Sequence, residues 1–180
     1  TRQEVEQDLR EVLDFEAREN EDPEGMPRAV WGTEIEYGET APFVLGEGED
    51  ALLLHGRIDR LDVIPGTEPL QFVLLDYKRG QGDPPAAILQ GVSFQLPLYY
   101  LAARRTVFEG HEAEGSWWAY YRVAHPVKFH SRAGQVANRN TPPISELVDA
   151  AVWYLVHHVA ALRRGEFPVI PARCGNCGFK

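Results

Sequence analysis

The chain has 180 residues, which is enough for one domain with a full core, and 44% of them are hydrophobic and 25% charged, as is ordinary for a globular protein. No apolar run approaches the ~20 residues that span a membrane, so we expect no membrane partner and a cytoplasmic location. The net charge of −9 argues against a dedicated nucleic-acid-binding module, which is usually basic. It does not exclude a metal-dependent enzyme that acts on nucleic acid, because a metal site also gathers carboxylates.

Hydrophobic periodicity and turn residues predict helices alternating with strands. Residues 1–27 are expected to form an acidic N-terminal helix and linker, in which charged faces surround one apolar stripe. We expect this helix to be a packing element with a solvated acidic face. The expected elements, in chain order, are a helix at 2–19, strands at 30–37, 51–64 and 71–78, a helix at 83–105, a strand at 117–123, a loop or irregular hairpin at 124–143 and a helix at 145–164.

The order of these elements indicates a single α/β domain over residues 1–180, with a central mixed β-sheet flanked by helices. The strand at 51–64 is expected to bend at Gly56 and to form a hairpin with the next strand. Asp83 suits the N-cap of the helix that follows. Pro97 lies inside that helix and is expected to kink it or loosen one turn.

The most informative stretch is Asp76-Tyr77-Lys78, which ends an apolar run and precedes a loop that contains glycine. Side chains two apart on a strand face the same side. Asp76 and Lys78 therefore share one face, and Tyr77 lies on the other. A carboxylate and an amine side by side at the end of a buried strand indicate a functional site.

A second acidic stretch lies on the preceding strand. Asp59 and Asp62 are three apart and so face opposite sides, which means that only one of them faces the acid–amine pair on the next strand. Asp62 is expected to form a surface ion pair with Arg60. For Asp59, a strand-end salt bridge with Arg57 is the alternative to a place in the site.

Together these residues are suited to a divalent cation. Carboxylates on neighbouring strands, Asp59 and Asp76, are able to hold Mg²⁺ or Mn²⁺, which prefer oxygen ligands. The backbone carbonyl of Tyr77 is a candidate third oxygen. Lys78 would then lie beside a metal-bound water and help to orient it or stabilise charge on a phosphate. The set fits metal-assisted phosphodiester hydrolysis.

Gln95 and Tyr99 are four apart, which places them on one face of the predicted helix. Most of their neighbours on that side are apolar, so a glutamine there needs a buried polar partner or a ligand. An ordinary hydrogen bond to the backbone explains Gln95 equally well.

Three motifs in order resemble the PD-(D/E)XK nuclease superfamily, and within it the RecB-like exonuclease domains, including those at the C-terminus of AddB-type helicase-nuclease subunits. The motifs are Gly-Arg-Ile-Asp-Arg at 56–60, Leu-Asp-Tyr-Lys at 75–78 and Gln-Leu-Pro-Leu-Tyr at 95–99. The resemblance covers roughly residues 30–180 and implies a restriction-endonuclease-like core.

Carried over to this chain, the resemblance implies that Asp59, Asp76 and Lys78 bind the divalent metal and activate water. It places Gln95 and Tyr99 beside the same site. Arginines that flank the site are candidates to position DNA phosphates: Arg57, Arg60 and Arg79.

The C-terminal tail, residues 165–180, resembles the end of those family members that carry an iron–sulfur cluster. A [4Fe–4S] cluster needs four thiolates, and the chain has only two cysteines, Cys174 and Cys177. We therefore expect an incomplete cluster motif, with a [4Fe–4S] cluster only in a longer parent protein. The chain begins with Thr1 instead of Met, which also indicates a piece of a longer protein.

The leading hypothesis is a divalent-metal-dependent DNA nuclease domain, an exonuclease that acts on single-stranded DNA or duplex ends in DNA repair or recombination. Its expected partners are DNA and a helicase domain or subunit. The alternative is a catalytically inactive nuclease-fold module that binds DNA or a helicase partner.

Overall fold

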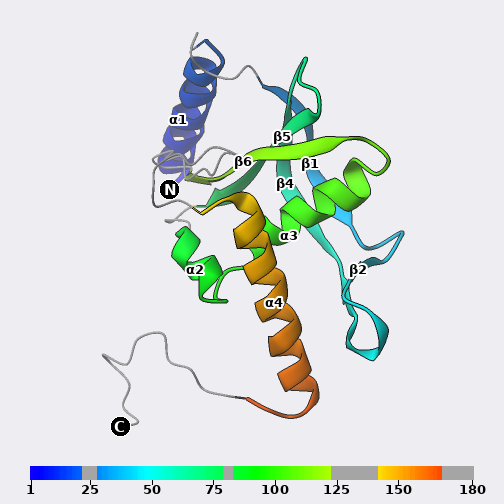
Figure 1. The fold of residues 1–180 in the computed structure, drawn as a ribbon. Coiled ribbons are helices and arrows are strands. Elements are labelled where there is room, and N and C mark those ends of the chain that lie inside the picture. Colours follow the sequence, from blue (N-terminus) through cyan, green and yellow to red (C-terminus); the bar gives the residue numbers. More distant parts are fainter. Residues whose placement is uncertain (22–27, 79–82, 123–141, 168–180) are drawn as a thin grey trace.

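The computed structural model describes residues 1–21, 28–78, 83–122 and 142–167. Its main sheet has four strands in the spatial order β1, β4, β5, β6 (Figure 1). β1, β4 and β5 are antiparallel neighbours, whereas β6 runs parallel to β5. This mixed sheet with its helices confirms the predicted α/β class. The strands are β1 Ala29–Tyr37, β4 Gly56–Ile64, β5 Leu70–Lys78 and β6 Ala113–Arg122.

A small second sheet interrupts the predicted strand at 51–64. That stretch divides at His55 into β3, which pairs with β2, and β4, which belongs to the main sheet. The division falls next to Gly56, where the bend was predicted. Figure 1 shows this hairpin extending away from the main sheet. Its elements are β2 Phe43–Leu45, the 3₁₀ turn η1 Gly48–Asp50 and β3 Leu52–Leu54.

The single helix predicted at 83–105 is wrong. The chain instead forms two α-helices and a π-helical turn: α2 Pro85–Leu89, α3 Gln95–Ala102 and η2 Ala103–Val107. The break contains Gly91, whose φ of 68° is left-handed and where a Cβ would lie 2.4 Å from Cγ of Tyr154. Pro97 consequently falls in the first turn of α3, where a missing N–H costs nothing, so it kinks no helix.

The outer helices match their predictions closely. α1 spans Arg2–Glu21 and α4 spans Ile144–Arg163, and the left-handed Gly165 follows α4, as a C-terminal glycine should. The N-cap of α2 is Pro84, one residue after the predicted cap Asp83. Most of the predicted loop at 124–143 lies outside the described residues. Within the described ranges, no helix has both the length and the apolar character needed to cross a membrane.

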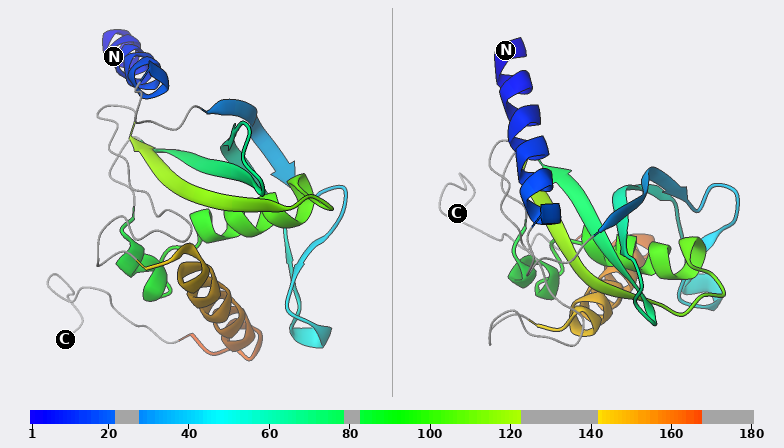
Figure 2. Two further views of the ribbon diagram at one scale, coloured as in Figure 1. Left: turned by 45° about the horizontal axis from the view of Figure 1, so that its top comes forward. Right: turned by 90° about the horizontal axis from the view of Figure 1, so that it is seen from above.

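The main sheet separates two apolar layers, with α1 on one side and α3 and α4 on the other (Figure 2). Along β5, Phe72 and Leu74 belong to the larger cluster with α3 and α4, while Val73 and Leu75 belong to a small cluster under α1. This alternation follows from the pleat of a strand. The end of β5 therefore lies between α3 in front and α1 behind. Its polar residues also alternate between these two faces.

Candidate active site

The candidate site lies where β4 and β5 stop pairing. Their antiparallel ladder ends at Arg60 and Leu75, before β5 itself ends, whereas β5 remains paired with β6 to its last residue. Beyond the ladder, the backbone N–H of Tyr77 donates to Oδ2 of Asp59 at 3.1 Å. A side-chain carboxylate thus satisfies a strand donor. The parted strand ends leave room for the two carboxylates of the site.

Asp76 is the most unusual residue of the site. Its side chain is fully buried, and neither carboxylate oxygen has a hydrogen-bond partner among the described residues. Its compensating contact is an ion pair, with Oδ2 at 2.7 Å from Nζ of Lys78. Burial raises the pKa of Asp76, Lys78 opposes that rise, and the nearby charge of Asp59 adds to it, which brings the pKa to about 6. A buried carboxylate with unused lone pairs is suited to a cation.

Hydrogen bonds join the remaining site residues into a ring. Nζ of Lys78 donates to Oε1 of Gln95 at 2.7 Å, and Nε2 of Gln95 donates to Oη of Tyr99 at 2.8 Å. The Tyr99 hydroxyl in turn donates to Oδ1 of Asp59 at 3.2 Å. Gln95 therefore bonds to side chains of the site, and the alternative of an ordinary backbone hydrogen bond does not hold. The ring closes through Tyr77, the residue between Asp76 and Lys78.

Tyr99 remains a proton donor throughout the ordinary pH range. Burial raises its pKa, and although the hydrogen bond from Gln95 opposes the rise, the negative charges of Asp59 and Asp76 add to it. Because the hydroxyl keeps its proton, it holds Asp59 by donating to it. α3 begins at Gln95, so one turn of that helix places both Gln95 and Tyr99 over the parted strands.

The residues present fit a divalent cation. The unpartnered oxygens of Asp76 and the adjacent carboxylate of Asp59 are hard oxygen donors, as is the carbonyl of Tyr77. No group of three or more His, Cys, Asp or Glu suited to a metal occurs among the described residues. A cation here therefore requires oxygens beyond the two carboxylates, which is usual for Mg²⁺ because it retains several waters.

The arginines expected to flank the site are placed differently from one another. Arg57 is exposed and pairs with Glu34 at 2.7 Å, so the predicted alternative of a salt bridge between Arg57 and Asp59 is not found. Arg60 points to the opposite face of the sheet, where its side chain is only 12% exposed. Three of the predicted residues, Arg79, Cys174 and Cys177, lie outside the described residues.

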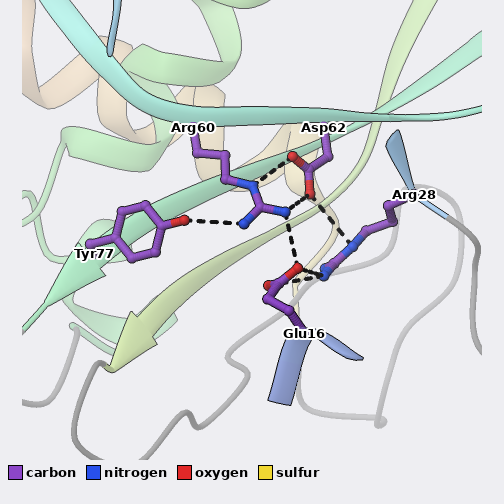
Figure 3. A network of polar contacts seen from close by, with 5 residues as sticks. All are labelled: Glu16, Arg28, Arg60, Asp62 and Tyr77. Carbon is purple, nitrogen blue, oxygen red and sulfur yellow. Dashed lines mark hydrogen bonds and ion pairs between the residues drawn. The ribbon is translucent and has the colours of Figure 1, made fainter. Parts of the chain in front are cut away.

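Behind the sheet, Arg60 belongs to a polar network that sequence reasoning largely missed (Figure 3). The predicted pair of Arg60 and Asp62 exists, at 2.7 and 2.8 Å, but Asp62 is fully buried and not at the surface. Its position inside the apolar run that ends β4 was the available signal. Two further members, Glu16 of α1 and Arg28 just before β1, gave no signal in the sequence because their partners are distant along the chain.

The family model of the PD-(D/E)XK nuclease superfamily matches residues 2–180, and the chain belongs to that superfamily. Members of this superfamily generally use divalent metal ions such as Mg²⁺. The match extends over the whole region of the expected resemblance and also includes α1. Fold and relationship together define a nuclease-type domain.

A more particular similarity is to a subunit of the ATP-dependent helicase/deoxyribonuclease of Caldanaerobacter subterraneus subsp. tengcongensis, with 30% identity over 103 residues. The matched region is 53% of this chain and only 9% of that protein, so the chain spans a small part of its relative. Among solved structures, the crystal structure of SSO0001 matches 81% of this chain and 56% of that chain at 14% identity, with a TM-score of 0.34. A similarity at that level carries no argument about fold or function.

Proposed function

We propose that this chain is a divalent-metal-dependent deoxyribonuclease domain that hydrolyses phosphodiester bonds. The observation that carries the proposal is the buried carboxylate of Asp76, which has no hydrogen-bond partner among the described residues and lies beside Lys78. A buried carboxylate without hydrogen-bond partners is costly to a fold even beside a lysine. A site that retains it at the end of a strand, in a chain of the nuclease superfamily, is best explained by cation binding.

The proposed roles follow from the contacts. Asp59, Asp76 and the carbonyl of Tyr77 hold the cation, and Lys78 orients the attacking water and stabilises charge on the scissile phosphate. A divalent cation held by these residues would supply Lewis-acid chemistry to the hydrolysis. Gln95 accepts from Nζ of Lys78 and so restrains its direction, and Tyr99 restrains Asp59.

The biological setting is proposed from the relatives. We infer an exonuclease that acts on DNA ends in repair or recombination, in the cytoplasm, as part of a protein that also contains or binds a helicase. The similarity to a helicase/deoxyribonuclease subunit supports this setting. Exposed Arg57 is the proposed phosphate contact among the described arginines, since Arg60 is committed to the back of the sheet.

The test is digestion of end-labelled single-stranded and double-stranded DNA with Mn²⁺, Mg²⁺ or EDTA. We expect cleavage with Mn²⁺ or Mg²⁺, none with EDTA, and none by Asp76→Ala. Asp83→Asn is the matched control, because it removes an exposed carboxylate in the segment before α2 and should cleave as the unaltered chain does.

Each result separates one part of the proposal. Metal-dependent cleavage that persists in Asp76→Ala would show that the site lies elsewhere. DNA binding without cleavage under any metal condition would favour the alternative, an inactive nuclease-fold module that serves a helicase partner.

A further inference from the structure

The polar network behind the sheet lies on the same two strands as the candidate site (Figure 3). Along β5, Tyr77 alternates with Asp76 and Lys78, and along β4, Arg60 follows Asp59, so network and site occupy opposite faces at the same strand ends. The network takes one residue from α1, one from the segment before β1 and three from the site strands: Glu16, Arg28, Arg60, Asp62 and Tyr77.

Arg60 is the centre of this network. Its Nε and Nη2 donate to the two oxygens of Asp62 at 2.7 and 2.8 Å, Nη2 also donates to Oε2 of Glu16 at 3.0 Å, and Nη1 donates to Oη of Tyr77 at 3.1 Å. The rigid guanidinium fork therefore joins β4, α1 and β5. Burial by itself lowers the pKa of Arg60, and the contacts with Asp62 and Tyr77 outweigh that effect, so Arg60 stays charged.

The charges of the network balance. Nη2 of Arg28 lies 3.3 Å from both carboxylate oxygens of Glu16, and its Nε lies 3.6 Å from Oδ2 of Asp62. Two guanidinium groups thus face two carboxylates, all largely buried. Replacing such ion pairs by apolar side chains is often neutral for stability. What the network supplies, and apolar packing does not, is a defined direction for each side chain.

Tyr77 connects this network to the candidate site. The β4–β5 ladder has ended before Tyr77, and two side chains of β4 contact it there: Asp59 accepts from its backbone N–H in front, and Arg60 donates to its hydroxyl behind. Asp59 and Arg60, which are consecutive on β4, therefore contact Tyr77 from opposite faces of the sheet. Any rotation of Tyr77 would turn its carbonyl and both neighbouring side chains.

α1 reaches the network through Glu16. Its apolar contact with the sheet is small, because Val12 and Phe15 pack on the cluster of Ile64, Val73 and Leu75, while Leu9 and Leu13 are 54% and 67% exposed. The ion pairs of Glu16 with Arg28 and Arg60 therefore contribute to fixing the position of α1. Displacement of α1 would remove one of the partners that direct Arg60.

We propose that Arg60 is a positioning residue for the metal site, that it acts through the hydroxyl of Tyr77, and that Glu16 makes this positioning depend on the docking of α1. The inference rests on the proposed function, because the site it supports is the proposed cation site. It assigns to the N-terminal helix an effect on catalysis, beyond packing.

The test measures Mn²⁺ affinity of the full chain by isothermal titration calorimetry, well below the unfolding temperature of each variant. Glu16→Gln, Arg60→Lys and Tyr77→Phe keep similar shapes and avoid an uncompensated Asp62. Each is expected to weaken Mn²⁺ binding about tenfold, the usual cost of losing support behind a ligand. Glu6→Gln, which removes an exposed carboxylate of the same helix, should bind Mn²⁺ as the unaltered chain does.

A double variant tests whether the residues act together. If Glu16 and Tyr77 act through Arg60, the Glu16→Gln/Tyr77→Phe chain loses less than the product of the two single losses. Turnover should fall in step with metal affinity at limiting Mn²⁺, with KM for DNA nearly unchanged. Independent, multiplying losses would overturn the shared route through Arg60.

The outcomes distinguish this inference from the proposed function. An unaltered chain that binds no Mn²⁺ contradicts both. An unaltered chain that binds Mn²⁺, with variants that melt earlier yet bind equally well, shows that the network is merely structural and overturns the inference alone. If Arg60→Lys fails to fold, Tyr77→Phe decides, because it removes a single hydroxyl.

Discussion

The two faces of the β4–β5 strand ends use similar residues for opposite purposes. In front, Asp76 is buried with no hydrogen-bond partner among the described residues, beside a single lysine. Behind, Asp62 is equally buried but receives two hydrogen bonds from Arg60 and lies near Arg28. The carboxylate of Asp76 therefore has lone pairs available for a cation, whereas the carboxylate of Asp62 already accepts hydrogen bonds from Arg60.

This difference shows that burial alone does not distinguish the two carboxylates. Both aspartates are fully buried in neighbouring strands, yet their partners differ. The pKa of Asp76 is raised to about 6, chiefly by burial that Lys78 only partly offsets. An unsatisfied buried charge costs stability, which is tolerated where a ligand later satisfies it. A buried charge whose hydrogen bonds are all made instead holds the surrounding strands and helices in place.

The largest expected effect comes from Asp76→Asn. We expect DNA cleavage to fall more than about a hundredfold, because loss of a ligand should exceed the cost of losing its supports. At the same time, the unfolding free energy at pH 7 should rise by about 1 kcal/mol, since a buried charge is removed whose oxygens have no hydrogen-bond partner among the described residues. Cleavage rates and urea unfolding of the same preparation measure both. A variant that is inactive and less stable would contradict the distinction between the faces.

Asp62→Asn should lower the unfolding free energy, whereas Asp76→Asn should raise it. Removing this carboxylate leaves Arg60 and Arg28 with only one of the two carboxylates that they share among the described residues, so we expect a loss of about 3 kcal/mol in unfolding free energy. Chemical denaturation at pH 7 measures it, with Glu6→Gln as the exposed control. A loss no greater than that of the control would show that the back-face charges are not coupled.

The pH dependence of stability should carry the signature of Asp76. Its pKa is about 6 in the fold against an ordinary 3.8, so between these values the folded state binds more protons than the unfolded state. The contribution of Asp76 to stability is then greatest at low pH and is lost as pH rises through 6, by about 3 kcal/mol in full. The difference in unfolding free energy between the chain and Asp76→Asn, measured from pH 4 to 7, isolates this slope. Added Mn²⁺ should oppose it, and identical pH profiles would refute the raised pKa.

Gln95→Ala tests the smallest effect, the restraint on Lys78. Nζ of Lys78 would lose its 2.7 Å bond to Gln95 but keep its ion pair with Asp76. We expect kcat to fall about tenfold with little change in folding. Single-turnover cleavage measures the chemical step, and Gln90→Ala, which alters an exposed glutamine just after α2, is the matched control. An unchanged single-turnover rate would leave Gln95 with a packing role only.

Much of the site was predictable from the sequence because its signals are local. Alternation along a strand places Asp76 and Lys78 on one face, and four-residue spacing places Gln95 and Tyr99 on one helix face. The break of the predicted helix at Gly91 was not foreseen, because the close approach of Tyr154 that demands a glycine comes from α4. The same break turned Pro97 from a predicted kink into a first-turn residue.

The sequence by itself determined the α/β class, the strand that ends in Asp76-Tyr77-Lys78 and the residue types offered for a cation. Only the tertiary structure decided which aspartate is left unsatisfied, because that depends on partners far along the chain. Glu16 and Arg28 reach β4 from outside the sheet and complete the back face, where Asp62 is paired. On the front face the β4–β5 ladder ends early. There Asp59 replaces a strand partner, and among the described residues neither oxygen of Asp76 has a hydrogen-bond partner.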